Sequence, residues 1–350
     1  MHLWTTLRHP GVRAALLSAL LFGAATPLAK PLLTGNSPWV IAALLYLGSG
    51  SGLFIFRRLT RAQAVHLPRA EAGWFSAAVL AGGVVAPVLL MLGLRAAPAS
   101  SAALLLNAEG VLTALLAWFA FRENVDRRVA LGMAAIVAGA VVLAWPRQVD
   151  GADLLPTLCI LGACLAWAID NNLTRKVSLS DGSWIASVKG LVAGSTNLVL
   201  ALALGAHLPP LPVMAATAVL GFLAYGVSLS LFVVALRHLG TARSGAYFSA
   251  APFLGALLAL LMGEAVSEQL VIAGLLMGLG IWLHLTETHS HEHLHDEIEH
   301  EHAHRHDDLH HTHEHGQEVA PGVVHSHRHR HAATRHAHAH FPDSHHQHSH

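Results

Sequence analysis

The feature that most constrains this chain is a series of ten apolar segments, each about as long as a membrane's apolar core is thick. They cover residues 14–33, 38–56, 72–94, 98–121, 129–145, 154–174, 184–206, 213–236, 244–263 and 270–285. An α-helix needs roughly 20 mainly apolar residues to cross a bilayer. Charged residues make up 12% of the chain, whereas soluble domains carry about 25%. The sequence therefore predicts an all-α integral membrane protein with ten transmembrane helices.

Two of these segments repeat one another. Residues 94–123 read LRAAPASSAALLLNAEGVLTALLAWFAFRE, and residues 236–264 read LRHLGTARSGAYFSAAPFLGALLALLMGE. Both copies begin with Leu-Arg, continue through small residues to Ala-Leu-Leu-Ala, and end on a glutamate, Glu123 or Glu264. The second copy is one residue shorter than the first. A repeat at so large a separation predicts two five-helix units, residues 14–145 and residues 154–285.

The basic residues of the connecting segments predict the orientation. If the N-terminus is cytoplasmic, the inner side holds Arg8, Arg13, Arg57, Arg58, Arg61, Arg69, Arg122, Arg127, Arg128, Arg175, Lys176, Arg237 and Arg243. The outer side then holds only Lys30, Arg95 and Arg147. Cytoplasmic connections carry the excess of Lys and Arg, so both termini should be cytoplasmic. Five spans per unit then invert the second unit relative to the first, as in many secondary transporters.

The repeated pair resembles the EamA-type repeat of the drug/metabolite transporter superfamily. That pattern has a mid-membrane Glu-Pro, of which Glu109-Gly110 keeps the first residue and Ala251-Pro252 the second. The resemblance covers about residues 14–285 and implies a multi-pass transporter of a bacterial inner membrane rather than an enzyme. The sequence has no nucleotide-binding loop, which favours an ion gradient as the energy source. We expect the lipid bilayer as a partner and no nucleic acid, and a homodimer remains open.

Polar residues inside apolar segments are costly and are candidate functional groups. The expected translocation pathway consists of Asn107, Glu109, Asp170, Asn171, Asn172, Tyr225 and Tyr247. Glu109 is the leading candidate, because a carboxylate there can bind a proton or a cation and exchange one for the other. The alternative is a protonated Glu109 that is hydrogen-bonded between helices. Asn107 lies about 200° around the helix from Glu109, so the two should not face one cavity.

Other charged residues near the segment ends have simpler interpretations. Asp170 either lies at the inner mouth of the pathway or is a solvated helix end. Lys189 follows Trp184 by five residues, and we expect its long side chain to reach the cytoplasmic interface. Glu123 and Glu264 end their segments, and we interpret them as structural.

Small residues occur at corresponding places in the two units. Gly82 and Gly83 precede Pro87 in the first unit, and Gly221 and Gly226 lie in the second. Small residues let helix backbones approach closely in a bilayer. These helices therefore either move against the central ones or pack statically against them.

The composition changes after residue 286. Residues 287–350 hold 23 of the 29 histidines and, with His neutral, a formal charge of −7. So few apolar residues predict a segment that is disordered without ligand. Imidazoles at every second position chelate borderline divalent metals through neutral nitrogen. The predicted ligands are His289, His291, His293, His295, His300, His302, His304, His306, His310, His311, His313, His315, His325, His327, His329 and His331.

A metal-binding tail on the cytoplasmic side predicts a secondary-active exporter of divalent transition metals that confers metal resistance. The tail resembles that of nickel and cobalt resistance permeases, which puts nickel and cobalt first, with zinc also considered. Imidazole ligands alone do not select the metal. We expect metal as substrate or regulator, no other cofactor, and protons as the coupling ion. The alternatives are an exporter of an organic metabolite or drug with a metal-sensing or buffering tail, and a metal-storage or sensor protein on an inactive permease fold.

Overall fold

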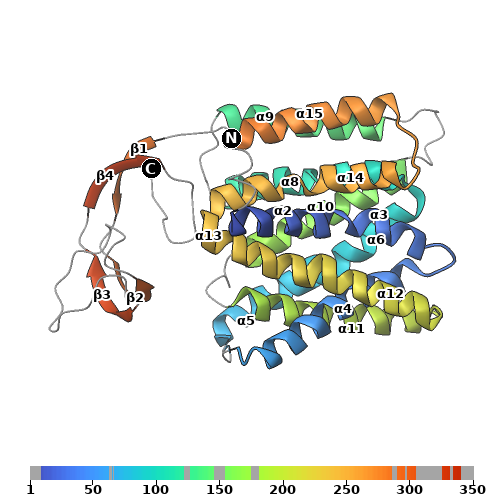
Figure 1. The fold of residues 1–350 in the computed structure, drawn as a ribbon, viewed down its shortest axis with the longest axis horizontal. Coiled ribbons are helices and arrows are strands. Elements are labelled where there is room, and N and C mark those ends of the chain that lie inside the picture. The colour runs from blue at the N-terminus through green and yellow to red at the C-terminus, as the bar shows by residue number, and fades with distance from the viewer. Residues whose placement is uncertain are drawn as a thin grey trace. The chain divides into compact units, whose positions relative to one another are not determined.

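The computed structural model describes residues 9–62, 65, 67–121, 127–145, 154–174, 181–285, 290–295, 298–304, 325–331 and 334–339. The chain divides into two units, residues 1–287 and 288–350, which are treated separately below. In the first unit every described regular element is a helix (Figure 1).

The helices of the first unit follow one another in two series. The first series is α2 (Pro10–Gly23), α3 (Ala25–Leu32), α4 (Pro38–Leu59), α5 (Arg69–Ala78), the π-helix η1 (Val79–Val85), α6 (Ala86–Ala96), α7 (Ala99–Leu105), α8 (Ala108–Phe121) and α9 (Arg127–Ala144). The second series is α10 (Leu154–Thr174), α11 (Gly182–Ala203), α12 (Leu211–Gly221), the π-helix η4 (Phe222–Val227), α13 (Ser228–Phe248), α14 (Ala251–Leu261) and α15 (Glu268–Leu285).

Seven helical stretches among the described residues are long and apolar enough to cross a membrane. They are Pro10–Leu32, Pro38–Leu59, Arg69–Ala96, Ala99–Leu116, Leu154–Thr174, Gly182–Ala203 and Leu211–Ala235. Three shorter apolar helices, Ala130–Ala144, Ala251–Leu261 and Glu268–Leu283, lie where the remaining spans are predicted. The multi-pass helical architecture therefore agrees with the sequence, and the count of ten spans stays a prediction.

The helix irregularities recur at nearly the same offset as the sequence repeat. The π-helix η1 follows α5 in the first series, and the π-helix η4 follows α12 at the matching place in the second. The break between α7 and α8 lies at residues 106–107, and the break between α13 and α14 lies at residues 249–250. Discontinuous helices at matching places in two units are typical of transporter binding regions.

The contacts between helices also reflect the equivalence of the two series. α4 packs on α11 and α9 packs on α15, so each of these two pairs joins equivalent helices. α7 packs on α14, which pairs the part before the break in one series with the part after the break in the other. α2 packs mainly on α13, while α10 packs mainly on α6 and η1. Exchanging the two series converts the α2 contact into the α10 contact. Figure 1 shows α9 and α15 lying together as a layer at one edge of the bundle.

The close approach of α4 and α11 depends on glycine. A Cβ atom at Gly50 would overlap the backbone of Gly190 and Leu191, and a Cβ atom at Gly190 would overlap the backbone of Gly50. The Ser187 hydroxyl donates to the Gly50 carbonyl at 3.1 Å across the same contact. Small residues here let two long helices pack backbone to backbone.

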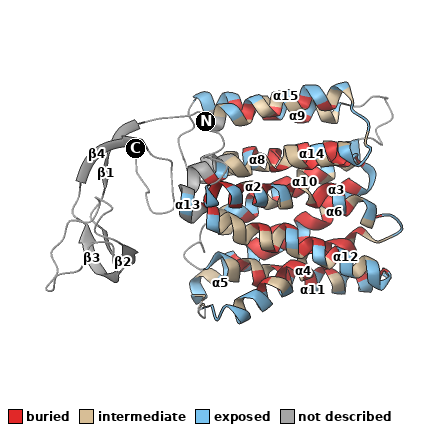
Figure 2. Ribbon diagram, in the orientation of Figure 1, coloured by how far each residue is buried: buried red, intermediate tan, exposed pale blue. Residues whose placement is uncertain are grey.

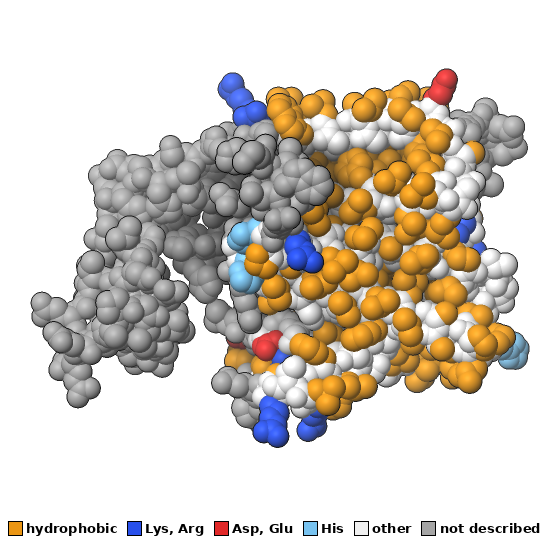
Figure 3. Space-filling model, in the orientation of Figure 1, with side chains coloured by type: hydrophobic (Ala, Val, Ile, Leu, Met, Phe, Trp, Pro, Cys, Tyr) orange, Lys and Arg blue, Asp and Glu red, His pale blue; other side chains and the backbone are white. Residues whose placement is uncertain are grey.

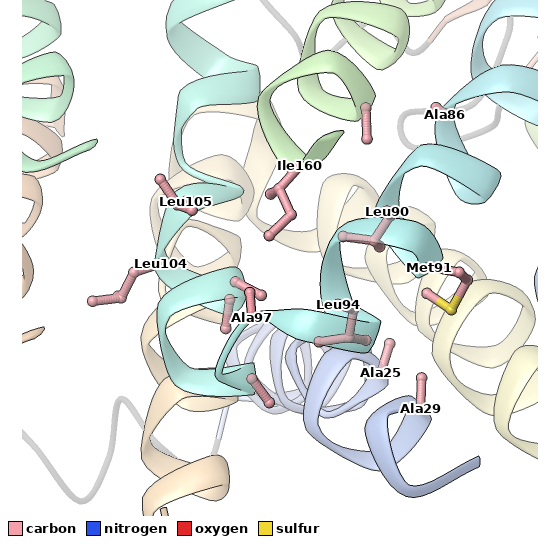
Figure 4. Packing of buried hydrophobic residues seen from close by; sticks show 14 of the residues in the cluster. Ala25, Ala29, Ala86, Leu90, Met91, Leu94, Ala97, Leu104, Leu105 and Ile160 are labelled. Atoms are coloured by element: carbon pink, nitrogen blue, oxygen red, sulfur yellow. The ribbon is translucent and has the colours of Figure 1, made fainter. Parts of the chain in front are cut away.

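The buried side chains form one main cluster between the helices. Figure 4 shows part of it, where Leu90 and Leu94 of α6 meet Ile160 of α10, with Leu104 and Leu105 of α7 close by. Buried residues line the interior of the bundle in Figure 2. Large apolar side chains cover the outer face seen in Figure 3, and the charged ones gather toward its edges. An apolar exterior of this kind fits a lipid environment.

One helix differs from its predicted bounds. The sequence predicts separate spans at residues 213–236 and 244–263, but α13 runs from Ser228 to Phe248 through that predicted connection. In the first series Pro98 forces the preceding Ala97 into an extended conformation with φ −83° and ψ 152°, which ends α6. Residues 236–248 contain no proline, so nothing local ends the helix there.

The second unit contains short strands where the sequence predicted disorder. β1 (Ser290–His295) pairs antiparallel with β4 (Thr334–Ala339), and β2 (Ile298–His304) pairs antiparallel with β3 (His325–His331). The prediction rested on low hydrophobicity alone. The physical reason for the difference is that histidine at every second position has the period of a β-strand.

Candidate functional site

A buried ion pair joins α10 to α11. The Lys189 ammonium donates to both carboxylate oxygens of Asp170 at 2.6 Å, and the two side chains are 16% and 8% exposed. The Thr174 hydroxyl also donates to Asp170 Oδ1, at 2.8 Å. The expectation that Lys189 reaches the interface is therefore wrong for this structure, as is the interpretation of Asp170 as a solvated helix end. The physical reason is that an ionised group in an apolar region is stabilised by pairing.

Glu109 lies at the start of α8, just after the break at residues 106–107. Its Oε1 accepts a hydrogen bond from Asn171 Nδ2 at 2.9 Å, and the same amide donates to Thr113 Oγ1 at 3.3 Å. Asn172 Nδ2 donates to the Thr113 carbonyl at 3.2 Å. The structure brings Glu109 together with Asn171 and Asn172 at the contact of α8 with α10, whereas Asp170 contacts α11 and η1.

Polar side chains donate hydrogen bonds to backbone carbonyls of the π-helix η1. Tyr46 OH donates to the Gly82 carbonyl at 2.8 Å, and Trp167 Nε1 donates to the same oxygen at 3.0 Å. Asn197 Nδ2 donates to the Gly83 carbonyl at 3.2 Å and to the next one along at 3.3 Å. Elements from both halves of the chain therefore hold η1 in place beside α10 and α11.

The remaining predicted pathway residues take different places. The Tyr225 ring, on η4, lies 6.0 Å from the Tyr46 ring and 5.8 Å from the Phe22 ring, centroid to centroid. Tyr247 packs against a small apolar cluster of α2 and α13. Asn107 is buried, and its amide donates to the Leu104 carbonyl at 2.9 Å and to the sulfur of Met277 at 3.8 Å. Asn107 and Glu109 thus have different partners, as their spacing predicts.

Charged and aromatic contacts lie at the predicted cytoplasmic end of α11. Arg57 Nη1 is 2.9 Å from Asp181 Oδ2 and donates to Ser183 Oγ at 2.6 Å. Asp181 also caps α11 through the Ser183 and Trp184 amides. Burial by itself would raise the pKa of Asp181, but the hydrogen bonds from Ser183, Arg57 and Trp184 outweigh it and hold the pKa at about 2. The Trp184 ring stacks on Phe75 of α5 at 5.7 Å.

A second polar group lies at the opposite end, where α6 ends and α7 begins. Glu264 accepts from the Ala99 and Ser100 amides at 2.6 and 2.8 Å, so it caps α7. Lys30 donates to the Leu94 and Ala97 carbonyls, which close α6. Burial by itself would raise the pKa of Glu264, but the Ser100 and Ala99 hydrogen bonds and the Lys30 charge bring it below its usual value. A cavity of about 390 Å³ adjoins these residues.

The histidine ligands predicted in the tail stay a prediction. His289, His306, His310, His311, His313 and His315 lie outside the described residues. The strands contain the others, His291, His293, His295, His300, His302, His304, His325, His327, His329 and His331. Within the described part of the chain, no group of three or more His, Cys, Asp and Glu side chains has a metal-holding arrangement.

The comparisons with known proteins agree with this architecture. Residues 9–145 match the EamA-like transporter family. An uncharacterized transporter from Methanothermobacter thermautotrophicus is 27% identical over 294 residues, covering 78% of this chain and 85% of that protein. A protein known from a crystal structure shares the fold, with a TM-score of 0.59 at 18% identity over 78% of this chain and 95% of that one. The chain is thus similar to membrane transporters over these residues, and neither match names a substrate.

Sequence reasoning missed the partner of Lys189 and the roles of Tyr46, Trp167 and Gly82. One signal was available for the ion pair. Lys189 and Asp170 are opposite charges in adjacent apolar segments, and intramembrane charges usually pair with one another. Gly82 was singled out only as a small packing residue, because the Asp170 side chain that requires glycine there comes from a distant part of the sequence.

Proposed function

We propose that this chain is a secondary-active exporter of divalent transition metals, nickel and cobalt first, in a bacterial inner membrane. The observation that carries the proposal is the union, in one chain, of an EamA-like transporter body with a segment, residues 287–350, that holds 23 histidines. Borderline divalent metals bind imidazole nitrogen. With both termini in the cytoplasm, the tail collects cytosolic metal for an outward-directed carrier and so confers metal resistance.

Two carboxylates, Glu109 on α8 and Asp170 on α10, support a cationic substrate. Glu109 accepts a hydrogen bond from the neutral side-chain amide of Asn171, and Asp170 directly precedes Asn171 in the sequence. Both carboxylates lie next to helix irregularities, and discontinuous helices form the ion and substrate sites of many secondary transporters. Glu109 carries the coupling proton in this proposal, because it can take up a proton when the cation leaves.

The first test is metal accumulation in cells with and without the protein, for nickel, cobalt and zinc. Loss of the protein should raise the cellular content of the transported metal under metal stress. Removing residues 287–350 should raise the external concentration needed for export, and replacing the tail histidines with asparagine should have the same effect at unchanged length. If cellular nickel, cobalt and zinc are all unaffected by loss of the protein, metal export is wrong.

The second test concerns Glu109 itself. Glu109→Gln should abolish metal flux driven by a pH gradient in proteoliposomes. Glu268→Gln is the matched control, because Glu268 is exposed at the start of α15, and its flux should equal that of the unaltered protein. Unchanged pH-driven flux in Glu109→Gln would show that another group carries the proton.

An organic metabolite or drug is the second candidate substrate, with the tail sensing or buffering metal. The aromatic side chains of Tyr46, Trp167 and Tyr225 beside the site favour it, because aromatic groups line most organic-ligand sites. The same proteoliposomes distinguish the candidates. Organic solute flux without metal flux supports this reading, and metal binding without any flux supports a storage or sensor protein.

A further inference from the structure

The strands of the second unit form two antiparallel ladders (Figure 1). The first ladder pairs β1 with β4, and its last pair is His295 with Thr334. The second ladder pairs β2 with β3, and its first pair is Ile298 with His331. Three steps forward along one side therefore match three steps back along the other, so both ladders have the same register. That register decides which residue types stand opposite each other.

In this register histidine stands opposite histidine five times in the described strands. These histidine rungs are His291–His338 and His293–His336 in the first ladder, and His300–His329, His302–His327 and His304–His325 in the second. The positions between the rungs of the second ladder match Glu299 with Arg330 and Glu301 with Arg328. Successive residues of a strand belong to opposite faces. The second ladder therefore has one face with three histidine rungs and another with two Glu–Arg pairs.

The Glu–Arg pairs favour this register over its neighbours. Opposite charges directly across an antiparallel ladder stabilise the pairing. A slip of one residue would place Glu301 opposite His327 or His329, and it would remove both Glu–Arg pairs together with every histidine rung. A slip of two residues would keep only one of the two Glu–Arg pairs. The charges on one face therefore hold histidine opposite histidine on the other.

Opposite histidines are better placed to share a metal ion than histidines of one strand. Residues directly opposite in an antiparallel ladder have Cβ atoms about 4.5–5.5 Å apart, whereas every second residue of a strand is about 6.8 Å further along the backbone. Two nitrogen ligands of one zinc ion lie no more than about 4 Å apart, because each metal–nitrogen bond is about 2.1 Å long. A rung meets this limit with less distortion than two neighbours in one strand.

We propose that each histidine rung binds one divalent transition-metal ion through its two imidazoles, so that the tail holds metal as an ordered series of two-histidine sites. Two ligands per ion agree with the described residues, among which no group of three or more His, Cys, Asp or Glu side chains could hold a metal. Neutral imidazole is the metal-binding form, and protonated histidines would place like charges opposite each other, which weakens strand pairing. This inference rests on the metal collection proposed for the tail.

The test counts the Ni²⁺ ions that the full-length protein in detergent binds at saturation, measured by equilibrium dialysis. Two double variants remove the same number of histidines. His302→Asn with His327→Asn removes one rung and should lower the count by one ion. His302→Asn with His329→Asn breaks two rungs and should lower the count by two ions. The single variant His302→Asn should already lose one ion, as many as the first double variant.

A charge reversal tests the register. Glu301→Arg places like charges opposite at Arg328 and should weaken Ni²⁺ binding by the adjacent rungs about twofold to fivefold, the change that a cross-strand charge pair contributes. Adding Arg328→Glu to the same chain restores opposite charges and should restore the affinity. Restored affinity supports the inference, and an affinity that Glu301→Arg leaves unchanged, or that the reversed pair does not recover, overturns it.

The dialysis counts separate failure of this inference from failure of the proposed function. Losses of one and two ions in the two double variants support the inference. Equal losses in the two double variants overturn the inference and leave metal binding by the tail standing. If the unaltered protein binds no Ni²⁺, Co²⁺ or Zn²⁺, the proposed collection of metal is wrong, and the inference fails with it.

Discussion

The ion pair between Asp170 and Lys189 makes an asymmetric prediction about stability. Lys189→Met would leave the Asp170 carboxylate, 8% exposed and wedged against Gly82, without its cation. Removing one partner of a buried ion pair typically costs about 3–5 kcal/mol. Asp170→Asn should cost clearly less, because Lys189 can extend its ammonium to the interface. The double variant should be more stable than Lys189→Met alone, since it leaves no unpaired charge.

Thermal unfolding of the purified protein in detergent measures these differences. A destabilisation of 1 kcal/mol lowers Tm by about 2–4 °C in proteins of 150–250 residues, so Lys189→Met should lower it by roughly 6–20 °C. The matched control is Lys30→Met, whose lysine binds carbonyls rather than a carboxylate. Equal losses for the two single variants at the ion pair would refute the asymmetry. A double variant less stable than Lys189→Met would refute the pairing energy itself.

Three further variants test the close contact at Gly82 and two helix caps. Gly82→Ala should separate the ion pair and reduce transport flux by more than about tenfold, a factor that corresponds to about 1.4 kcal/mol in the transition state. Gly73→Ala, whose added Cβ meets nothing within 4 Å, is the control and should leave flux unchanged. Normal flux in Gly82→Ala would show that the close contact is dispensable. Glu264→Gln should weaken the cap of α7 by about 1 kcal/mol. Because the pKa of Glu264 lies below its usual value, the difference in Tm from the unaltered protein should be present at neutral pH and vanish as the pH falls through that lowered pKa. Glu268→Gln, at an exposed site, should not alter Tm. Asp181→Ala should lose about 1 kcal/mol of helix capping, which Asp181→Ser should restore. This loss should be the same at every pH between 5 and 8, because the pKa of the Asp181 carboxyl is about 2. A Tm difference from the unaltered protein that changes within that pH range would contradict the assignment.

The two π-helices and the two helix breaks place irregular backbone next to the site. η1 packs against α10 and α11, and the matching η4 carries Tyr225 toward Tyr46. A π-helix leaves carbonyls without their usual partners, and π-helical segments occur frequently at functional sites. Here those carbonyls accept hydrogen bonds from Tyr46, Trp167 and Asn197, so side chains from both halves of the chain hold the irregular helix in place.

Much of this protein could be predicted from local sequence. Apolar runs of bilayer length determine an all-helical membrane body, because backbone groups in lipid must satisfy one another within the segment. The offset between the two repeat copies predicts where a helix irregularity in one half should recur in the other. Glu109 and residues 170–172 were identified because polar residues are rare in such segments, and a change in composition marks where the tail begins.

Only the tertiary structure decided which of these polar groups meet. Lys189 near a helix end predicts an extended side chain, and its carboxylate partner is reached only because α10 and α11 pack side by side. Glycine at position 82 has no local cause either, since the side chain that excludes a Cβ atom comes from α10. The energy of a residue entering lipid depends on that residue alone, whereas the energy of a buried charge depends on what lies next to it, and sequence separation does not reveal that neighbour.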